Sequence, residues 1–316
     1  MQKLFRIFIY ATLFSLSHKI NCAPKQTPLD TCHTPCTQLK EGSITIFIHG
    51  TVFPGVSRLM GHHEKRRGLY HYSANPRRLT TRQRLGRALY SVAPDEFPLE
   101  SFYKFYWSGE LTLPARKKAA QELFNLLKDH KGPCTLIAHS HGCNVALHLA
   151  EYAEQKDALG NVSPLTIERL ILLAPPVQEA TTHLVHAPNF KRVYSCYSIA
   201  DVIQVADPQG ITKEMKKGKE KLPLFSKRTY APGPRLTQAQ ITFGERNPSH
   251  RDFILPPFFG QLPHILKLLD TPQARNSVHV IIEVPFQGHL PHLIEKKQER
   301  RMMKAHKPST KQRRKQ

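Results

Sequence analysis

The sequence predicts an α/β fold with a mostly parallel central sheet and helices on both of its faces. From Ser43 onward, short β-branched or apolar runs alternate with longer amphipathic patterns, and this alternation is typical of parallel strands joined by helices. The chain has 316 residues and 40% hydrophobic content, enough for a large core. Because no self-similarity appears at a period of about 20 to 50 residues, solenoids and propellers are not expected.

The expected strands are short apolar runs, since strands of a covered parallel sheet are buried on both faces. They span residues 43–48, 134–139, 169–174, 192–198 and 239–244, with 278–284 as a candidate for one more. The expected helices span residues 114–130, 142–156 and 261–269. In the first of these, Leu123, Leu126 and Leu127 fall on one stripe while lysines occupy the other side.

Two segments do not follow the alternation. Residues 53–99 are rich in Arg and His, and residues 209–235 are rich in Lys, Gly and Pro. We expect both to be insertions over the carboxyl edge of the sheet, where α/β proteins keep their substrate loops. Solvated surface is the alternative interpretation of each, and a lid function for 53–99 is a further hypothesis.

Both ends of the chain differ in composition from the predicted domain at 43–294. Residues 1–22 predict a targeting segment, because Lys3 and Arg6 precede a short apolar run. Export or membrane association is therefore expected, and the sequence leaves open whether Cys22 carries a lipid. We expect residues 23–42 to be a leader or linker. Residues 295–316 form a basic tail that we expect to be disordered.

The formal net charge of +22 predicts attraction to anionic surfaces. The tail at 295–316 is either a solubilising end or an arm that binds an anionic membrane. Nucleic acid is not expected as a partner, since no zinc-finger, helix-turn-helix or RNP-like motif is present. No Cys/His cluster has the spacing of a zinc site, so neither a metal nor another cofactor is predicted.

The sharpest local pattern surrounds Ser140. A buried strand runs into a tight turn and then directly into a helix, and Ala138 and Gly142 flank the serine at two residues on each side. This pattern is typical of a nucleophile elbow, in which the serine has a strained backbone and needs small neighbours. The helix that follows directs its positive end toward the serine oxygen.

On these residues the chain resembles the α/β-hydrolase superfamily, in particular its lipase-like and esterase-like bacterial members. They carry a similar His-Ser-His-Gly turn followed by Asn-Val-Ala, although Ala138 replaces their first glycine. The resemblance implies the α/β-hydrolase fold and a serine hydrolase acting on an acyl ester or lipid. It extends over residues 43–269 and includes Trp107-Ser108-Gly109 and Arg116. We interpret Trp107 as a packing or substrate-wall residue.

The first predicted strand and its His49-Gly50-Thr51 turn resemble the segment that supplies half of the oxyanion hole in this superfamily. The expected amide donors are His141 on one side and Thr51 or Val52 on the other. A β-turn with a buried histidine is the alternative interpretation of this segment.

The remaining catalytic residues are argued from chain order, because serine, acid and histidine follow in that sequence in this fold. Asp201 lies in a turn just after the strand at 192–198, and His250 follows the strand at 239–244. They are the expected acid and base. The rivals are Asp207 for the acid and, for the base, His264, His289 and His292.

The predicted function is hydrolysis of a carboxylic ester by Ser140, Asp201 and His250 through an acyl-enzyme. Acyl transfer uses the same residues, and the sequence does not separate the two reactions. A non-catalytic binding protein on a hydrolase scaffold is the third hypothesis, although all three catalytic positions are filled.

Overall fold

The structure is a computed structural model, which describes Cys36 and residues 39–51, 67–72, 83–155, 163–206, 226–285 and 290–294. All of these residues fall within one compact unit. The segments at 1–22, 209–225 and 295–316 lie outside the described residues, so the expectations for them stay predictions. None of the helices in the described ranges is long and apolar enough to cross a membrane.

A single sheet contains nine strands among the described residues, in the order β2-β3-β1-β4-β5-β6-β7-β8-β9. Every pairing from β3 through β8 is parallel, while β2 and β9 pair antiparallel at the two edges. The strands are β1 (Ile44–Ile48), β2 (Gly68–His71), β3 (Phe102–Tyr106), β4 (Cys134–His139), β5 (Arg169–Leu173), β6 (Val193–Tyr197), β7 (Leu236–Thr242), β8 (Val280–Glu283) and β9 (His292–Leu293).

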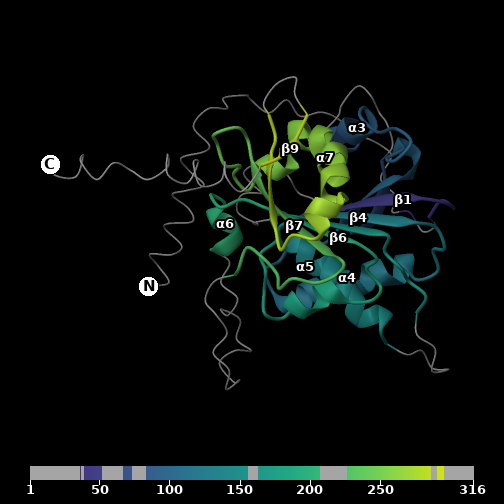
Figure 1. Ribbon diagram of the computed structural model, residues 1–316. Helices are drawn as coiled ribbons and strands as arrows, with labels where there is room; N and C mark the ends of the chain where they lie inside the picture. Colours follow the sequence, from purple (N-terminus) through teal and green to yellow (C-terminus); the bar gives the residue numbers. More distant parts are fainter. Residues whose placement is uncertain are drawn as a thin grey trace, which may run out of the picture. The chain divides into compact units, whose positions relative to one another are not determined.

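Helices cover both faces of this sheet (Figure 1). On one face α4 packs against α5, and on the other α3 packs against α7. The helices are α3 (Gln83–Tyr90), α4 (Leu113–Leu127), α5 (His141–Ala153), α6 (Val202–Val205), α7 (Pro256–Leu269) and α8 (Pro272–Arg275), with short 3₁₀ turns at Leu99–Ser101, Thr182–His186 and Asp252–Ile254. The predicted fold class, a mostly parallel sheet covered on both faces, is confirmed.

Two hydrophobic cores follow from this layering. Along β1 and β4, Ile46 and Leu136 point into the core beneath α4 and α5, whereas Phe47 and Ile137 point into the core beneath α3 and α7. Successive side chains of a strand point to opposite faces. Both faces are buried, which explains why the strands are apolar throughout instead of alternating.

The predicted strand at 134–139 is confirmed residue for residue, and other boundaries differ. Helix α7 begins at Pro256, five residues before the predicted start, and continues through Pro263. Pro256 and Pro257 occupy the first turn of the helix, where the missing N–H groups are not needed, whereas Pro263 lies inside the helix and leaves out one helical hydrogen bond. Strand β3 was not predicted, because its sequence Phe-Tyr-Lys-Phe-Tyr places Lys104 within the apolar run.

The described parts of the segment at 53–99 include regular elements of the fold that its composition did not predict. Strand β2 extends the sheet beside β3, and α3 packs with Leu85 and Leu89 fully buried against the core on the α7 side. Gly86 faces Phe102, and an added Cβ there would lie 3.2 Å from the ring. Residues 83–90 are therefore part of the core, not an addition to its surface.

This placement of α3 predicts that Leu89→Ala lowers the free energy of unfolding by about 2–5 kcal/mol, the cost of a cavity at a buried leucine. Arg84→Ala, at an exposed position of the same helix, should change it by no more than about 0.5 kcal/mol. Urea denaturation measures both. Equal effects of the two substitutions would contradict the burial of α3.

Candidate active site

Ser140 lies at a sharp corner between β4 and α5. Its backbone has φ 55° and ψ −131°, a conformation that a residue with a side chain rarely adopts. The Ser140 amide donates to the Leu173 carbonyl at 3.0 Å, which ties the corner to the end of β5. The strained turn expected at this serine is therefore present.

Two glycines allow the chain to close around this corner. A Cβ on Gly50 would lie 2.6 Å from the Ser140 Cβ, and a Cβ on Gly142 would lie 2.5 Å from the His49 carbonyl oxygen. Real Cβ atoms do not approach other atoms so closely. The turn after β1 and the first turn of α5 thus touch at backbone distance, and this contact brings residues 49–51 beside Ser140.

Asp201 lies at the carboxyl end of β6 and begins α6. Its carboxylate is buried, and Oδ1 accepts a hydrogen bond from the Gln204 amide at 3.0 Å. This is an N-cap, which satisfies one of the unpaired donors of a helix start. Arg228 supports the backbone of this turn, because its guanidinium donates to the Ser198 and Asp201 carbonyls, each at 3.1 Å.

His250 meets the second oxygen of the same carboxylate. The distance from His250 Nδ1 to Asp201 Oδ2 is 2.7 Å, and the two side chains are 11% and 0% exposed. A carboxylate only accepts, so Nδ1 carries the proton and Nε2 of the neutral ring is left as the acceptor. An imidazole in this tautomer can act as a general base.

His139 packs against His250 at the base of the serine turn. The ring centroids are 4.6 Å apart, and His139 Nε2 donates to the His250 carbonyl at 3.1 Å. Burial is the main cause that holds the pKa of His139 well below its usual value, and the neighbouring His250 and His49 lower this pKa further. A neutral His139 thus supports the backbone that carries His250.

No hydrogen bond joins Ser140 Oγ to His250 within the described parts of the chain. The structure brings His250 to Asp201 and to His139, the residue that precedes Ser140. The triad assignment of Ser140 therefore stays a prediction.

The expected oxyanion donors lie on the two sides of the Gly50–Ser140 contact. His141 is the first residue of α5, where amide groups point away from the helix body. Thr51 follows the turn after β1, and its hydroxyl oxygen is enclosed with no hydrogen-bond partner among the described residues. Val52 lies outside the described residues.

Trp107 fixes the turn that carries Thr51. Its indole nitrogen donates to the His49 carbonyl at 2.8 Å, and its amide donates to His49 Nε2 at 3.3 Å. His49 Nδ1 consequently carries the proton that it donates to the Gly50 carbonyl at 2.6 Å. The interpretation of Trp107 as a packing residue fits these contacts.

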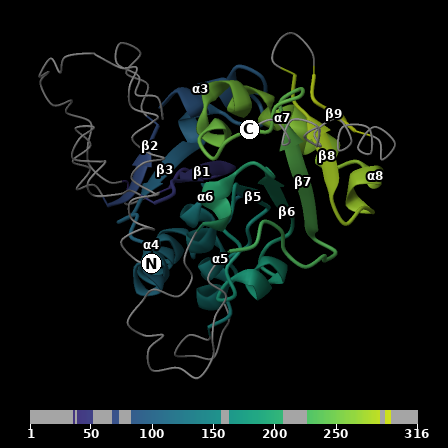
Figure 2. The same cartoon turned by 90° about the vertical axis from the view of Figure 1, so that its left-hand side faces the viewer.

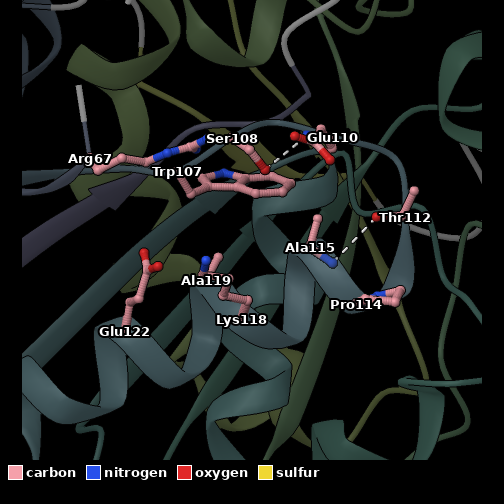
Figure 3. Close-up of a pocket in the computed structure, with 10 residues that line it drawn as sticks. All are labelled: Arg67, Trp107, Ser108, Glu110, Thr112, Pro114, Ala115, Lys118, Ala119 and Glu122. Carbon is pink, nitrogen blue, oxygen red and sulfur yellow. Dashed lines mark hydrogen bonds between the residues drawn. The ribbon is translucent and has the colours of Figure 1, made fainter. Parts of the chain in front are cut away.

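Trp107 also borders a cavity of about 340 Å³ between α4 and the segment that follows β3. In Figure 3 its indole lies above Ala115 and Ala119, with Ser108 and Glu110 beyond the ring. One side chain thus links this cavity to the turn after β1. Ser140, Asp201 and His250 are not among the residues that line it.

Arg116 connects the start of α4 to the start of α5. It is 5% exposed, and Nη1 lies 3.0 Å from the Leu111 carbonyl oxygen and 3.3 Å from His141 Nδ1. A guanidinium only donates, so His141 Nδ1 accepts this contact. The cation therefore orients the side chain of the residue that follows Ser140.

The structure describes two of the four rival residues for the acid and the base. Asp207 and His289 lie outside the described residues. His264 is half-buried within α7, and His292 lies in the edge strand β9 with 56% of its side chain exposed. Within the described ranges, no cluster of three or more His, Cys, Asp or Glu side chains is arranged to hold a metal ion.

Sequence reasoning did not identify the residues that hold the acid. Gln204 Nε2 donates to the Pro175 carbonyl at 2.6 Å, which anchors α6 to the loop after β5. The Asp201-x-x-Gln204 spacing resembles a capping box and could have indicated this role. Arg228 carries no such local signal, because it lies 27 residues from Asp201 in sequence.

Comparison with known proteins adds little to this geometry. No protein-family model matches the chain, and no curated protein matches it. Among solved structures, the chain is similar to the crystal structure of Zea mays acyl-protein thioesterase 2, with 13% sequence identity and a TM-score of 0.26. The match covers 54% of this chain and 75% of that chain. The fold class accordingly rests on the strand order and layering described above.

The contact at Gly142 predicts that Gly142→Ala lowers the free energy of unfolding by about 1–3 kcal/mol, because the added methyl group meets the backbone at the end of β1. Gly260→Ala is the matched control. Among the described residues, one atom lies within 4 Å of a Cβ added to this helical glycine, at 3.9 Å, and the change should stabilise by about 0.5–1 kcal/mol. If Gly142→Ala is as stable as this control, the close approach is wrong.

The lowered pKa of His139 predicts a pH dependence of stability. Below about pH 6.5 the unfolded chain protonates this imidazole and the folded chain does not, so acid favours unfolding. His139→Gln removes the titrating group and keeps a donor for the His250 carbonyl. This substitution should reduce the slope of the unfolding free energy against pH, in the acid range, by up to about 1.4 kcal/mol per pH unit.

Denaturation at a series of pH values measures this slope, with His183→Gln at an exposed position as the control. An unchanged slope in His139→Gln would show that His139 is not held neutral by the fold.

Proposed function

We propose that this chain is a serine hydrolase, similar to bacterial lipases and esterases, that cleaves a carboxylic ester with Ser140 as nucleophile. The observation that carries the proposal is the 2.7 Å hydrogen bond between Asp201 and His250. These residues come from turns after two different strands, β6 and β7. They meet at the sheet edge where β4 delivers the strained Ser140.

In the proposed reaction, His250 Nε2 takes the proton of the Ser140 hydroxyl as the serine oxygen attacks the ester carbonyl. The buried Asp201 carboxylate holds the imidazole in the required tautomer and stabilises the imidazolium. Its second oxygen is already engaged by the Gln204 amide. The carboxylate is therefore held in one orientation throughout the step.

The negative charge that develops on the carbonyl oxygen requires preset donors. The amides of His141 and Thr51 suit this role, because Gly50 and Gly142 bring their two turns into contact beside Ser140. Removing one such donor from a serine hydrolase costs about 10² to 10³ in rate. The protonated His250 then protonates the departing alcohol.

Hydrolysis of the acyl-enzyme completes the cycle. His250 accepts a proton from water, the hydroxide attacks the acyl carbon, and the proton returns to Ser140 as the acid leaves. We further propose that the substrate is an acyl ester or a lipid, that residues 1–22 direct export or membrane association, and that the basic tail at 295–316 binds anionic membranes.

Ser140→Ala tests the proposal directly. The wild-type protein should be labelled by a fluorophosphonate probe and should hydrolyse p-nitrophenyl esters, whereas Ser140→Ala should lose labelling and at least about 10⁴-fold in kcat/KM. Asp201→Asn should reduce kcat by about 10⁴ and leave the fold intact. Esters of graded chain length would separate a lipase from a small-ester esterase.

Ser91→Ala, at an exposed position outside the site, is the control and should keep full labelling. Circular dichroism and thermal unfolding check that each variant is folded. Labelling of Ser140→Ala at the wild-type rate would refute Ser140 as the nucleophile.

A further inference from the structure

The turn that carries Asp201 exposes a group of aliphatic side chains. Ile199, Val202 and Ile203 are 51%, 60% and 45% exposed, although Asp201 between them is 1% exposed. These three residues are called the α6 patch below. Single exposed apolar side chains are common on protein surfaces, but three within five residues form a contiguous apolar feature.

This exposure belongs to a well-anchored turn. Gln204 of α6 is fully buried and donates to the Pro175 carbonyl, and Arg228 donates to the backbone before and after the patch residue Ile199. These bonds fix the backbone of the turn from inside. The aliphatic side chains consequently point outward from a rigid base, as an anchoring surface requires.

The α6 patch lies at the edge where the proposed reaction takes place. The carboxyl ends of parallel strands share one edge of a sheet, and Ser140, Asp201 and His250 all follow such ends. Figure 2 shows α6 in front of the ends of β5 and β6. A surface that covers the α6 patch is therefore also the surface that faces the candidate active site.

The net charge of the full chain favours an anionic surface as the occupant. The chain carries +22, most of it outside the described residues, so two whole copies repel each other although this edge itself is not strongly charged. An anionic bilayer is attracted by the same charge and accepts aliphatic side chains at the boundary between headgroups and acyl chains. Arg251, exposed beside His250, adds a cation at this edge.

We propose that the α6 patch inserts into the surface of an anionic phospholipid membrane and thereby presents the candidate active site to esters held in that membrane. The inference deepens the proposed function and rests on it. It concerns a surface other than the basic tail, so the two contributions to membrane binding are separable.

Vesicle cosedimentation of the full chain tests this inference, using phosphatidylcholine vesicles with and without phosphatidylserine. The double variant Val202→Ser/Ile203→Ser should bind the anionic vesicles about tenfold more weakly than wild type, because binding scales with the apolar area inserted. Val92→Ser/Val278→Ser is the matched control. It removes two exposed aliphatic side chains at 39% and 59% exposure, one in the turn after α3 and one two residues before β8.

Salt separates the patch from the basic tail. At about 1 M salt the screening length falls to about 3 Å, which suppresses the electrostatic contribution of the tail. The difference between the α6 variant and the control should persist under this condition. Equal vesicle binding by wild type, the α6 variant and the control would overturn the inference. An α6 variant that loses self-association in light scattering while its vesicle binding stays unchanged would also overturn it.

Activity separates this inference from the proposed function. The α6 variant should hydrolyse a soluble p-nitrophenyl ester within about twofold of wild type and lose about tenfold on the same acyl ester held in anionic vesicles. Ser140→Ala should lose both activities and keep vesicle binding. Loss of the soluble activity in the folded α6 variant would contradict a role confined to docking.

Discussion

The close approach of the turn after β1 to the corner at Ser140 is the constraint on which the candidate site depends. Gly50 and Gly142 leave no room for a Cβ at this contact, and Ser140 takes a positive φ between them. Strained backbone of this kind persists only where the surrounding structure holds it in place. Here hydrogen bonds from the Ser140 amide to β5 and from Trp107 to His49 provide that support.

A second level of organisation comes from the parallel sheet. Because the strands run in one direction, the turns after β1, β4, β6 and β7 collect at one edge, and residues far apart in sequence meet there. Asp201 and His250 are 49 positions apart and form a hydrogen bond. The same edge carries the exposed aliphatic side chains next to Asp201, so the proposed chemistry and the proposed membrane contact share one surface.

The sequence predicted the layers of the fold because buried strands such as the one at 134–139 and the stripe of leucines in α4 carry strong periodic signals. The turn at Ser140 was predictable because its constraints are local. The hydrogen bond of Asp201 to His250 followed only from chain order in a resembling superfamily, and chain order cannot exclude rivals such as His292.

The missed features depend on contacts between distant segments. Strand β3 contains Lys104, and β2 and α3 lie in a stretch whose Arg and His content suggested surface. Burial of Leu85 and Leu89 there requires α7 as a partner, which no local pattern reveals. The support of Asp201 by Arg228 is likewise a tertiary contact without a local signature.

The most direct test of the central claim is a crystal structure of the protein after reaction with an organophosphate ester. The account predicts phosphorus bonded to Ser140 Oγ, the phosphoryl oxygen facing the amides of His141 and Thr51, and His250 Nε2 within hydrogen-bond distance of the bound group. An adduct on another residue, or a phosphoryl oxygen directed away from both amides, would contradict it.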